Sequence, residues 1–173
     1  MTTNETGTVP SRRTSRKWHV ISELDLMRLV ADHSQLEQMC SDLLDAIEST
    51  FQLSIQLRDL LDTTLIPHAR NEEQWLDERL AGEGAPAVAR ALLDTVRAGH
   101  SAMIHGCRRL ANALEATQSM PWGLVSDFVG HCRQSMMLEA LAISYLAGHR
   151  LTPEARELLE SSMVSLQTGR VDA

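Results

Sequence analysis

Apolar side chains recur at steps of three and four along most of the chain, which is the spacing of one face of an α-helix. Four long stretches show this period, and a shorter one follows near the C-terminus. We expect helices over about 22–47, 51–80, 86–116 and 124–147, and a short fifth helix over about 153–167. The pattern predicts an all-α fold, an antiparallel up-down-up-down four-helix bundle with a short C-terminal fifth helix.

Local signals place the breaks between these helices. Thr152 and Pro153 suit the start of the fifth helix, because threonine caps helices and proline is favoured in the first turn. The segments 81–86 and 118–123 contain Gly and Pro and predict the connections on either side of the third helix. Pro67 lies inside the second stretch, so that helix should either kink or restart there.

A chain of 173 residues is long enough to fold as one domain around its own core. We assign residues 20–173 to this domain. Residues 1–19 contain little that a core could bury, and we expect a disordered basic tail there. Its basic side chains are Arg12, Arg13, Arg16 and Lys17. Such tails are in most cases merely solvated, and contact with an acidic protein partner is the alternative.

The composition disfavours several classes of function. A formal net charge of −7 argues against nucleic acid as a partner. No apolar run reaches the length of a membrane-spanning helix, and the N-terminus lacks the apolar segment of a secretory signal. Three cysteines without a Cys-x-x-Cys pair argue against a disulfide framework and favour the reducing cytoplasm. The small aromatic content implies a core of Leu, Ala and Met.

Histidines occupy the apolar face of each long helix. His33, His68, His100 and His131 fall in line with the apolar residues of their stretches, whereas His105 lies well round the third helix. One histidine on such a face is in most cases a core residue that is hydrogen-bonded to a neighbour. Four in one bundle would leave many ring nitrogens to satisfy, because buried polar atoms need hydrogen-bond partners.

Glu72 lies one helical turn after His68, on the same face. A carboxylate on an apolar face is costly unless a metal ion or a buried basic network pairs with it. A metal ion shared with the histidines is the more economical explanation, and His and carboxylate donors suit iron, zinc or manganese. Cys40 and Cys107 lie two turns from the nearest histidines, so we interpret them as small core residues.

The stretch Leu65–Glu73 resembles the His-x-x-x-Glu helix of hemerythrin-like (HHE cation-binding) domains. His33, His100 and His131 resemble the histidines of the family's first, third and fourth helices. The resemblance covers roughly residues 22–147 and is most specific at the second helix. It implies a four-helix bundle that holds a non-haem di-iron centre, with an oxo or hydroxo bridge. It also implies oxygen binding, redox sensing, or a response to peroxide or nitric oxide.

Two positions depart from the family's full pattern. Ile104 stands where the family has a second histidine on the third helix. Ser135 and Met136 stand where an acid normally follows the fourth-helix histidine. Four histidines and one carboxylate therefore remain, whereas the full family pattern has five histidines and two carboxylates. The metal ligands that the resemblance implies are His33, His68, Glu72, His100 and His131.

Other acidic residues are candidates for the missing carboxylate. Asp127 precedes His131 by one turn on nearly the same face, and Glu73 adjoins the second-helix glutamate. The plainer interpretation of Asp127 is an acid that the helix dipole favours in an early turn. Glu139 and Tyr145 lie two or more turns beyond His131, roughly 12 Å or more along the helix axis, so we expect both to be too distant for the site.

Three functional hypotheses follow. The first is a hemerythrin-like iron protein, whose missing ligands leave positions open to a gaseous or peroxide ligand for binding, sensing or turnover. The second is a degenerate hemerythrin-like bundle that acts as a regulatory or interaction module with one weakly held metal ion or none, because Met136 and Met137 could suit a partner's groove. The third is a mononuclear site built on His68 and Glu72, similar to a two-histidine-one-carboxylate iron centre.

Overall fold

The computed structural model describes residues 21–45, 49–81, 86–117 and 119–168. These residues form helices and no β-strand, so the predicted all-α class is confirmed. None of these helices is both long enough and apolar enough to cross a membrane. The predicted basic tail, residues 1–19, lies outside the described residues. The α-helices are α1 (Glu23–Asp45), α2 (Thr50–Leu60), α3 (Ile66–Leu76), α4 (Ala87–Ala116), α5 (Trp122–Ala147) and α6 (Pro153–Thr168).

The predicted second helix is continuous from α2 through α3. Two short π-helical turns interrupt its α-helical hydrogen bonding, η1 (Leu61–Leu65) before α3 and η2 (Asp77–Ala81) after it. Pro67 has no N–H to donate, and the wider turn that precedes it lets the helix continue without a restart. Ser49 caps the whole element, because its side chain accepts a hydrogen bond from the Gln52 N–H at 3.2 Å.

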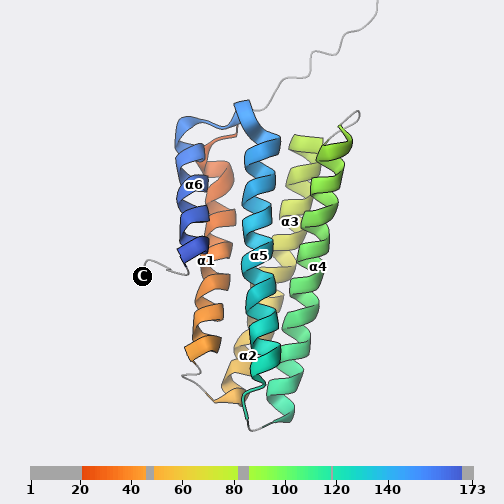
Figure 1. The fold of residues 1–173 in the computed structure, drawn as a ribbon, viewed down its shortest axis with the longest axis vertical. Coiled ribbons are helices and arrows are strands. Elements are labelled where there is room, and N and C mark those ends of the chain that lie inside the picture. The colour runs from red at the N-terminus through yellow and green to blue at the C-terminus, as the bar shows by residue number, and fades with distance from the viewer. Residues whose placement is uncertain (1–20, 46–48, 82–85, 118, 169–173) are drawn as a thin grey trace, which may run out of the picture.

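The long helices lie side by side along the longest axis of the molecule (Figure 1). α5 packs against α4 and α1, and α4 also packs against α2 and α3. α6 lies beside α1 and contacts α5 as well. A single parallel bridge joins Ile21 to Leu151, and the Ile21 N–H donates to the Arg150 carbonyl at 2.7 Å. This bridge holds the starts of α1 and α6 together.

The core consists of two apolar layers with polar residues between them. Leu36, Leu57 and Met103 belong to one layer. Leu26 and Ile143 belong to the other. Each fully buried leucine contributes roughly 1.5–3 kcal/mol, so these layers supply most of the stabilisation. The buried polar residues that separate them, called the central layer below, are His33, His68, Glu72, His100 and Glu139.

The three cysteines, Cys40, Cys107 and Cys132, are free and buried in the apolar layer that contains Leu57. The Cys107 thiol donates to the Leu57 carbonyl at 3.3 Å. Burial raises the pKa of Cys107 to about 12, so the thiol stays protonated. The interpretation of Cys40 and Cys107 as core residues is confirmed.

Candidate metal centre

His68 and Glu72 are the residues that α3 contributes to the central layer. They lie one turn apart on its buried face, and their side chains are 2% and 4% exposed. His68 Nε2 lies 3.4 Å from Glu72 Oε2. Because the π-turn η1 precedes Pro67, the helix continues past the proline and presents both side chains to the core. The two residues therefore share one buried face, as the sequence predicts.

Histidines from two other helices face the same carboxylates. His100 of α4 places Nε2 3.0 Å from Glu72 Oε2 and 3.2 Å from Glu139 Oε1. His33 of α1 places Nε2 2.8 Å from Glu139 Oε2. The rings of His33 and His100 both pack edge-on against His68, with centroid separations of 5.3 and 5.2 Å. Three imidazoles thus surround two carboxylates.

Glu139 of α5 completes the central layer, and its side chain is fully buried. Its Oε2 atom lies 3.4 Å from His68 Nε2, and its Oε1 atom accepts a hydrogen bond from the Ser135 hydroxyl at 2.8 Å. Ligand atoms from four residues all lie within 4.8 Å of one another, and these residues are His68, Glu72, His100 and Glu139. This buried group could hold a metal ion, because imidazole nitrogens and carboxylate oxygens are common metal ligands.

The ring nitrogens that face away from this group have partners of their own. His68 Nδ1 lies 3.3 Å from Asp32 Oδ2, and His100 Nδ1 lies 2.9 Å from Glu73 Oε1. A carboxylate on the outer nitrogen orients a metal-binding histidine and raises the basicity of its inner nitrogen. Glu73, a predicted candidate ligand, therefore lies outside the buried group, as a partly exposed partner of His100.

Buried charges shift the pKa values of the central layer. Burial lowers the pKa of His100, but hydrogen bonds with Glu139 and Glu72 outweigh burial and raise it to about 10. Burial likewise lowers the pKa of His68, and Asp32 and Glu139 raise it to about 9. Burial raises the pKa of Glu139, but the histidines lower it well below its usual value. Without a metal ion, pairing between imidazolium and carboxylate therefore holds the layer together.

Three buried atoms of the central layer have no hydrogen-bond partner among the described residues. They are His33 Nδ1, His68 Nε2 and Glu72 Oε1. A buried polar atom without a partner costs about 1–3 kcal/mol. His68 and Glu72 belong to the group whose ligand atoms converge, so a bound cation would satisfy the unpartnered atoms of both. The donor set and these two atoms fit a metal ion.

Glu37 of α1 is also buried, one turn after His33, but it is paired elsewhere. Arg133 of α5 donates from Nε to both oxygens of Glu37, at 3.0 and 3.1 Å, and its Nη2 atom also contacts the carboxylate. The guanidinium therefore satisfies Glu37 with a two-pronged ion pair. This pair links α1 to α5 and leaves the central layer with two carboxylates.

Gly99 allows α4 to approach α5 closely at the central layer. A methyl group on Gly99 would lie 2.2 Å from Ser135 Oγ, far closer than unbonded atoms approach. Ser135 in turn donates to Glu139, as described above. The glycine that precedes His100 is therefore part of the geometry that positions Glu139.

His131 does not lie in the core. The structure exposes His131 and Asp127 and does not bring either side chain to the central layer, so their predicted role as ligands stays a prediction. They line a separate surface cavity of about 170 Å³ together with His105 and Arg109. The buried face of α5 is displaced by about one residue from the predicted face. It includes Val125, Phe128, Val129, Cys132, Ser135, Met136 and Glu139.

Glu139 is the site residue that the sequence interpretation missed. The expectation that it is too distant used His131 as the reference, and His131 is not in the site. The spacing of the cysteines carried a usable signal, because each buried cysteine lies seven residues, or two turns, from a member of the central layer. The pairs with this spacing are His33 with Cys40, His100 with Cys107, and Glu139 with Cys132.

Of the five predicted ligands, four meet in the central layer, and Glu139 lies where a fourth-helix ligand was expected. The four are His33, His68, Glu72 and His100. The site thus combines three imidazoles with two carboxylates from four helices. Comparisons of the chain with protein-family models, with curated proteins and with solved structures give no match.

Proposed function

We propose that this chain is a hemerythrin-like non-haem iron protein. In this proposal α1, the α2–α3 element, α4 and α5 form an antiparallel up-down-up-down four-helix bundle, α6 is the additional short helix, and the central layer binds iron. The observation that carries the proposal is the convergence of His68, Glu72, His100 and Glu139 at one buried point. Together with His33, these residues come from each of the four helical elements.

The donor set is compatible with iron and excludes the metals that need thiolate ligands. Imidazole and carboxylate ligands suit iron, manganese and zinc, whereas thiolates favour copper(I) and iron–sulfur clusters. The three cysteines lie two turns from the central layer, roughly 10 Å along their helices, and are not part of the donor set. Within the imidazole and carboxylate group of metals, iron is the one that the resemblance to hemerythrin-like domains implies.

The two oxygens of Glu139 face different histidines, which supports a centre of two irons. Oε2 lies near His33 and His68, whereas Oε1 lies near His100. A carboxylate with this division can serve one ion through each oxygen. We therefore propose a di-iron centre, to which Glu139 would contribute one oxygen for each ion.

A single ion is the second candidate, and the compactness of the group favours it. Bonds of about 2.1 Å place opposite ligands of one ion about 4.2 Å apart. The four ligand atoms lie within 4.8 Å of one another, which is close to that span. One ion would then take His68, Glu72, His100 and Glu139, while His33 would remain a hydrogen-bond partner of Glu139.

Bound iron would supply electron-transfer chemistry and positions for dioxygen, peroxide or nitric oxide. The protein's residues then have separate tasks. Asp32 and Glu73 orient the rings of His68 and His100, and Ser135 holds a carboxylate oxygen. Apolar layers lie on both sides of the buried group. These tasks suit binding, sensing or detoxification of a small oxidising ligand.

The alternative, a regulatory or interaction module, loses one of its supports. Met136 is fully buried, and Met137 is partly buried and packs against the same apolar layer. Met136 therefore offers no exposed surface to a partner's groove, and part of Met137 is covered as well. The basic tail, the other feature named for a protein partner, lies outside the described residues.

Metal analysis of the 173-residue chain, purified from iron-replete cells, tests the proposal. About two irons per chain, with an oxo-to-iron absorption band in the near ultraviolet, is the expected result for a di-iron centre. One iron per chain without that band would support the mononuclear candidate. If the protein holds no metal after purification and after anaerobic loading with ferrous iron, both candidates are excluded.

A further inference from the structure

A cavity of about 210 Å³ reaches the central layer from the side of the molecule where α1 and α3 lie next to each other. His68 and Glu72 form part of its lining, so the cavity meets the buried metal-binding group directly. Its remaining lining comes mainly from α1 and α3, with Ile143 from α5. A molecule in this cavity would therefore touch two of the residues that could hold the metal.

The cavity is larger than dioxygen, nitric oxide or hydrogen peroxide requires. A water-sized ligand takes up roughly 30 Å³, whereas an apolar cavity of about 150 Å³ is enough to hold benzene. A volume of about 210 Å³ therefore suits a six-membered ring or a short alkyl chain with one small polar group. This size argues for an organic molecule in addition to a diatomic gas or hydrogen peroxide.

Part of the cavity wall is apolar. Leu26, Leu29 and Ile143 are buried residues of the neighbouring apolar layer, and Trp75 packs against that layer. Such walls bind the apolar body of a ligand because they remove it from water. The polar residues that line the cavity are Asp25, Arg28, Asp32 and Asn71, together with His68 and Glu72 of the central layer.

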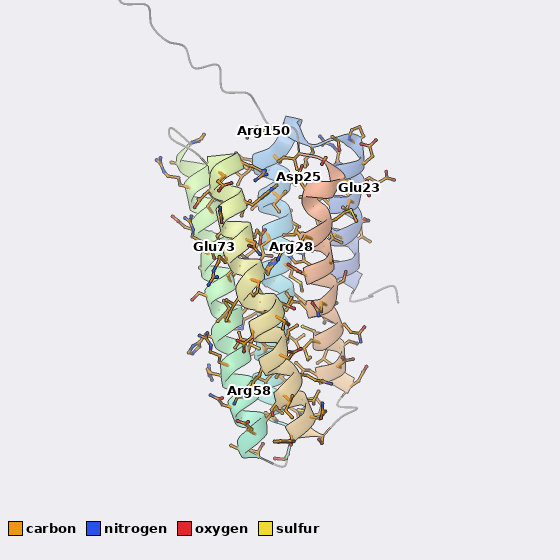
Figure 2. The ribbon with its side chains drawn as sticks, turned by 180° about the vertical axis from the view of Figure 1, so that it is seen from behind. Glu23, Asp25, Arg28, Arg58, Glu73 and Arg150 are labelled. Carbon is orange, nitrogen blue, oxygen red and sulfur yellow. The ribbon has the colours of Figure 1, made fainter. Side chains whose placement is uncertain are left out.

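The acidic groups of the rim are already engaged, whereas a basic group is not. Asp25 accepts hydrogen bonds from the N–H and the hydroxyl of Ser22, at 2.8 and 3.0 Å. Asp32 pairs with His68 Nδ1. Arg28 is exposed and has no ion-pair partner among the side chains that the structure describes. Figure 2 shows Asp25 and Arg28 on the side of α1 that faces α3.

Trp75 provides a second donor without an acceptor. Its indole Nε1 atom is buried and has no hydrogen-bond partner among the described residues. Trp75 and Arg28 are therefore two cavity-lining residues whose N–H donors have no acceptor among the described residues. A ligand that complements them carries acceptor oxygens and a negative charge.

We propose that this cavity binds a small organic carboxylate. The apolar body of the ligand packs against Leu26, Leu29 and Trp75, and its carboxylate lies at Arg28. The bound molecule lies beside His68 and Glu72, so it would be a substrate or effector of the proposed iron centre. Only the role as substrate or effector rests on the proposed function. Binding itself needs no iron, because the cavity walls and the Arg28 guanidinium belong to the protein.

Calorimetric titration of the 173-residue protein with three ligands of equal size tests the charge preference. Benzoate, benzamide and benzamidine are respectively anionic, neutral and cationic at pH 7. Benzoate should bind about fivefold more tightly than benzamide, and benzamidine should bind most weakly. Equal binding of all three, or no binding of benzoate at millimolar concentration, overturns the proposal.

Two variants of Arg28 test whether this residue causes the preference for an anionic ligand. Arg28→Ala should reduce benzoate binding to the level of benzamide, and Arg28→Lys should restore most of it. Arg70→Ala is the matched control, because Arg70 is an exposed arginine of α3 that does not line the cavity. Unchanged benzoate binding in Arg28→Ala contradicts the proposed position of the carboxylate.

Tryptophan fluorescence tests the position of the apolar body. In a variant with Trp18 and Trp122 replaced by Phe, Trp75 is the remaining tryptophan. Benzoate should change its emission with the same affinity that calorimetry gives, and constant emission at saturation would place the ligand elsewhere. Iron content is measured separately on the same preparations. A protein without iron that binds benzoate refutes the proposed function alone, and a protein with iron that does not bind it refutes this inference alone.

Discussion

At the scale of single residues, the histidines of the central layer use their two ring nitrogens differently. His68 directs Nε2 toward two buried glutamates and has Asp32 at Nδ1. His100 shows the same division, with Glu73 at its outer nitrogen. The outer nitrogen of His33 has no partner among the described residues. An outer carboxylate holds the ring in place, so His68 and His100 are better oriented for metal binding than His33.

Replacing a residue of the buried group should remove the metal, whereas replacing an exposed histidine should not. We expect His68→Ala and Glu72→Ala each to lose most of the bound iron, because each removes a ligand and leaves its neighbours unpaired. His131→Ala and His105→Ala are matched controls, since both side chains are exposed. Iron content per folded chain, with folding checked by circular dichroism, gives the comparison. Loss of iron in His131→Ala would mean that the ligands lie outside the central layer.

At the scale of helices, one close contact sets the relation of α4 to α5. Gly99 leaves room for Ser135, and Ser135 donates to Glu139. The contact therefore determines which face of α5 meets the central layer. Gly130, an exposed glycine of α5, has no heavy atom near the position of an added methyl group. The two glycines thus differ in the space beside them, although both lie within helices.

An alanine at each of these glycines should have opposite effects on stability. Gly99→Ala gains helix propensity but forces Ser135 away, and we expect it to lower the free energy of unfolding by about 1–3 kcal/mol. Gly130→Ala gains helix propensity without a clash and should raise the free energy of unfolding by up to about 1 kcal/mol. Urea denaturation of the metal-free proteins measures both. Equal stability of the two variants would rule out a tight contact at Gly99.

At the scale of the whole molecule, the fold places a charged layer between two apolar layers. In the metal-free protein, His68 and His100 both lie close to Glu139. The pKa of His68 is raised from 6.5 to about 9, and that of His100 from 6.5 to about 10. The pKa of Glu139 is lowered below 4.5. Folding therefore binds protons at the histidines and releases one at the glutamate, which links stability to pH.

The metal-free protein should be less stable at alkaline pH. The raised histidine pKa values contribute stability that is fully present below about pH 6.5 and is lost as the pH rises through 9 to 10. The lowered pKa of Glu139 contributes stability above about pH 4.5, which is lost on acidification. Urea midpoints measured from pH 6 to 10.5 check the alkaline limb. The comparison is the His100→Gln variant, whose stability should fall less steeply as the pH rises. A urea midpoint that does not change with pH in the unmodified protein would contradict the pairing of histidines with Glu139.

The sequence by itself determined the helices and the strongest part of the site. The observed ends of α4 and α5 lie within two residues of the predicted ones. This agreement has a physical reason, because periodicity, caps and breakers act between residues close in the chain. The pairing of His68 with Glu72 was predictable for the same reason, since a spacing of four residues defines one helix face.

Only the tertiary structure decided which face of α5 is buried, and with it the second carboxylate. Leu141 and Tyr145 of α5 are exposed although both have large apolar surfaces. Apolar residues therefore lie on more than one side of α5, and its own pattern does not identify the buried side. Packing against α1 and α4, including the contact at Gly99, turns Glu139 inward and leaves His131 outside. The outer partners of the histidines and the cavity likewise arise from residues far apart in the chain, which no local pattern connects.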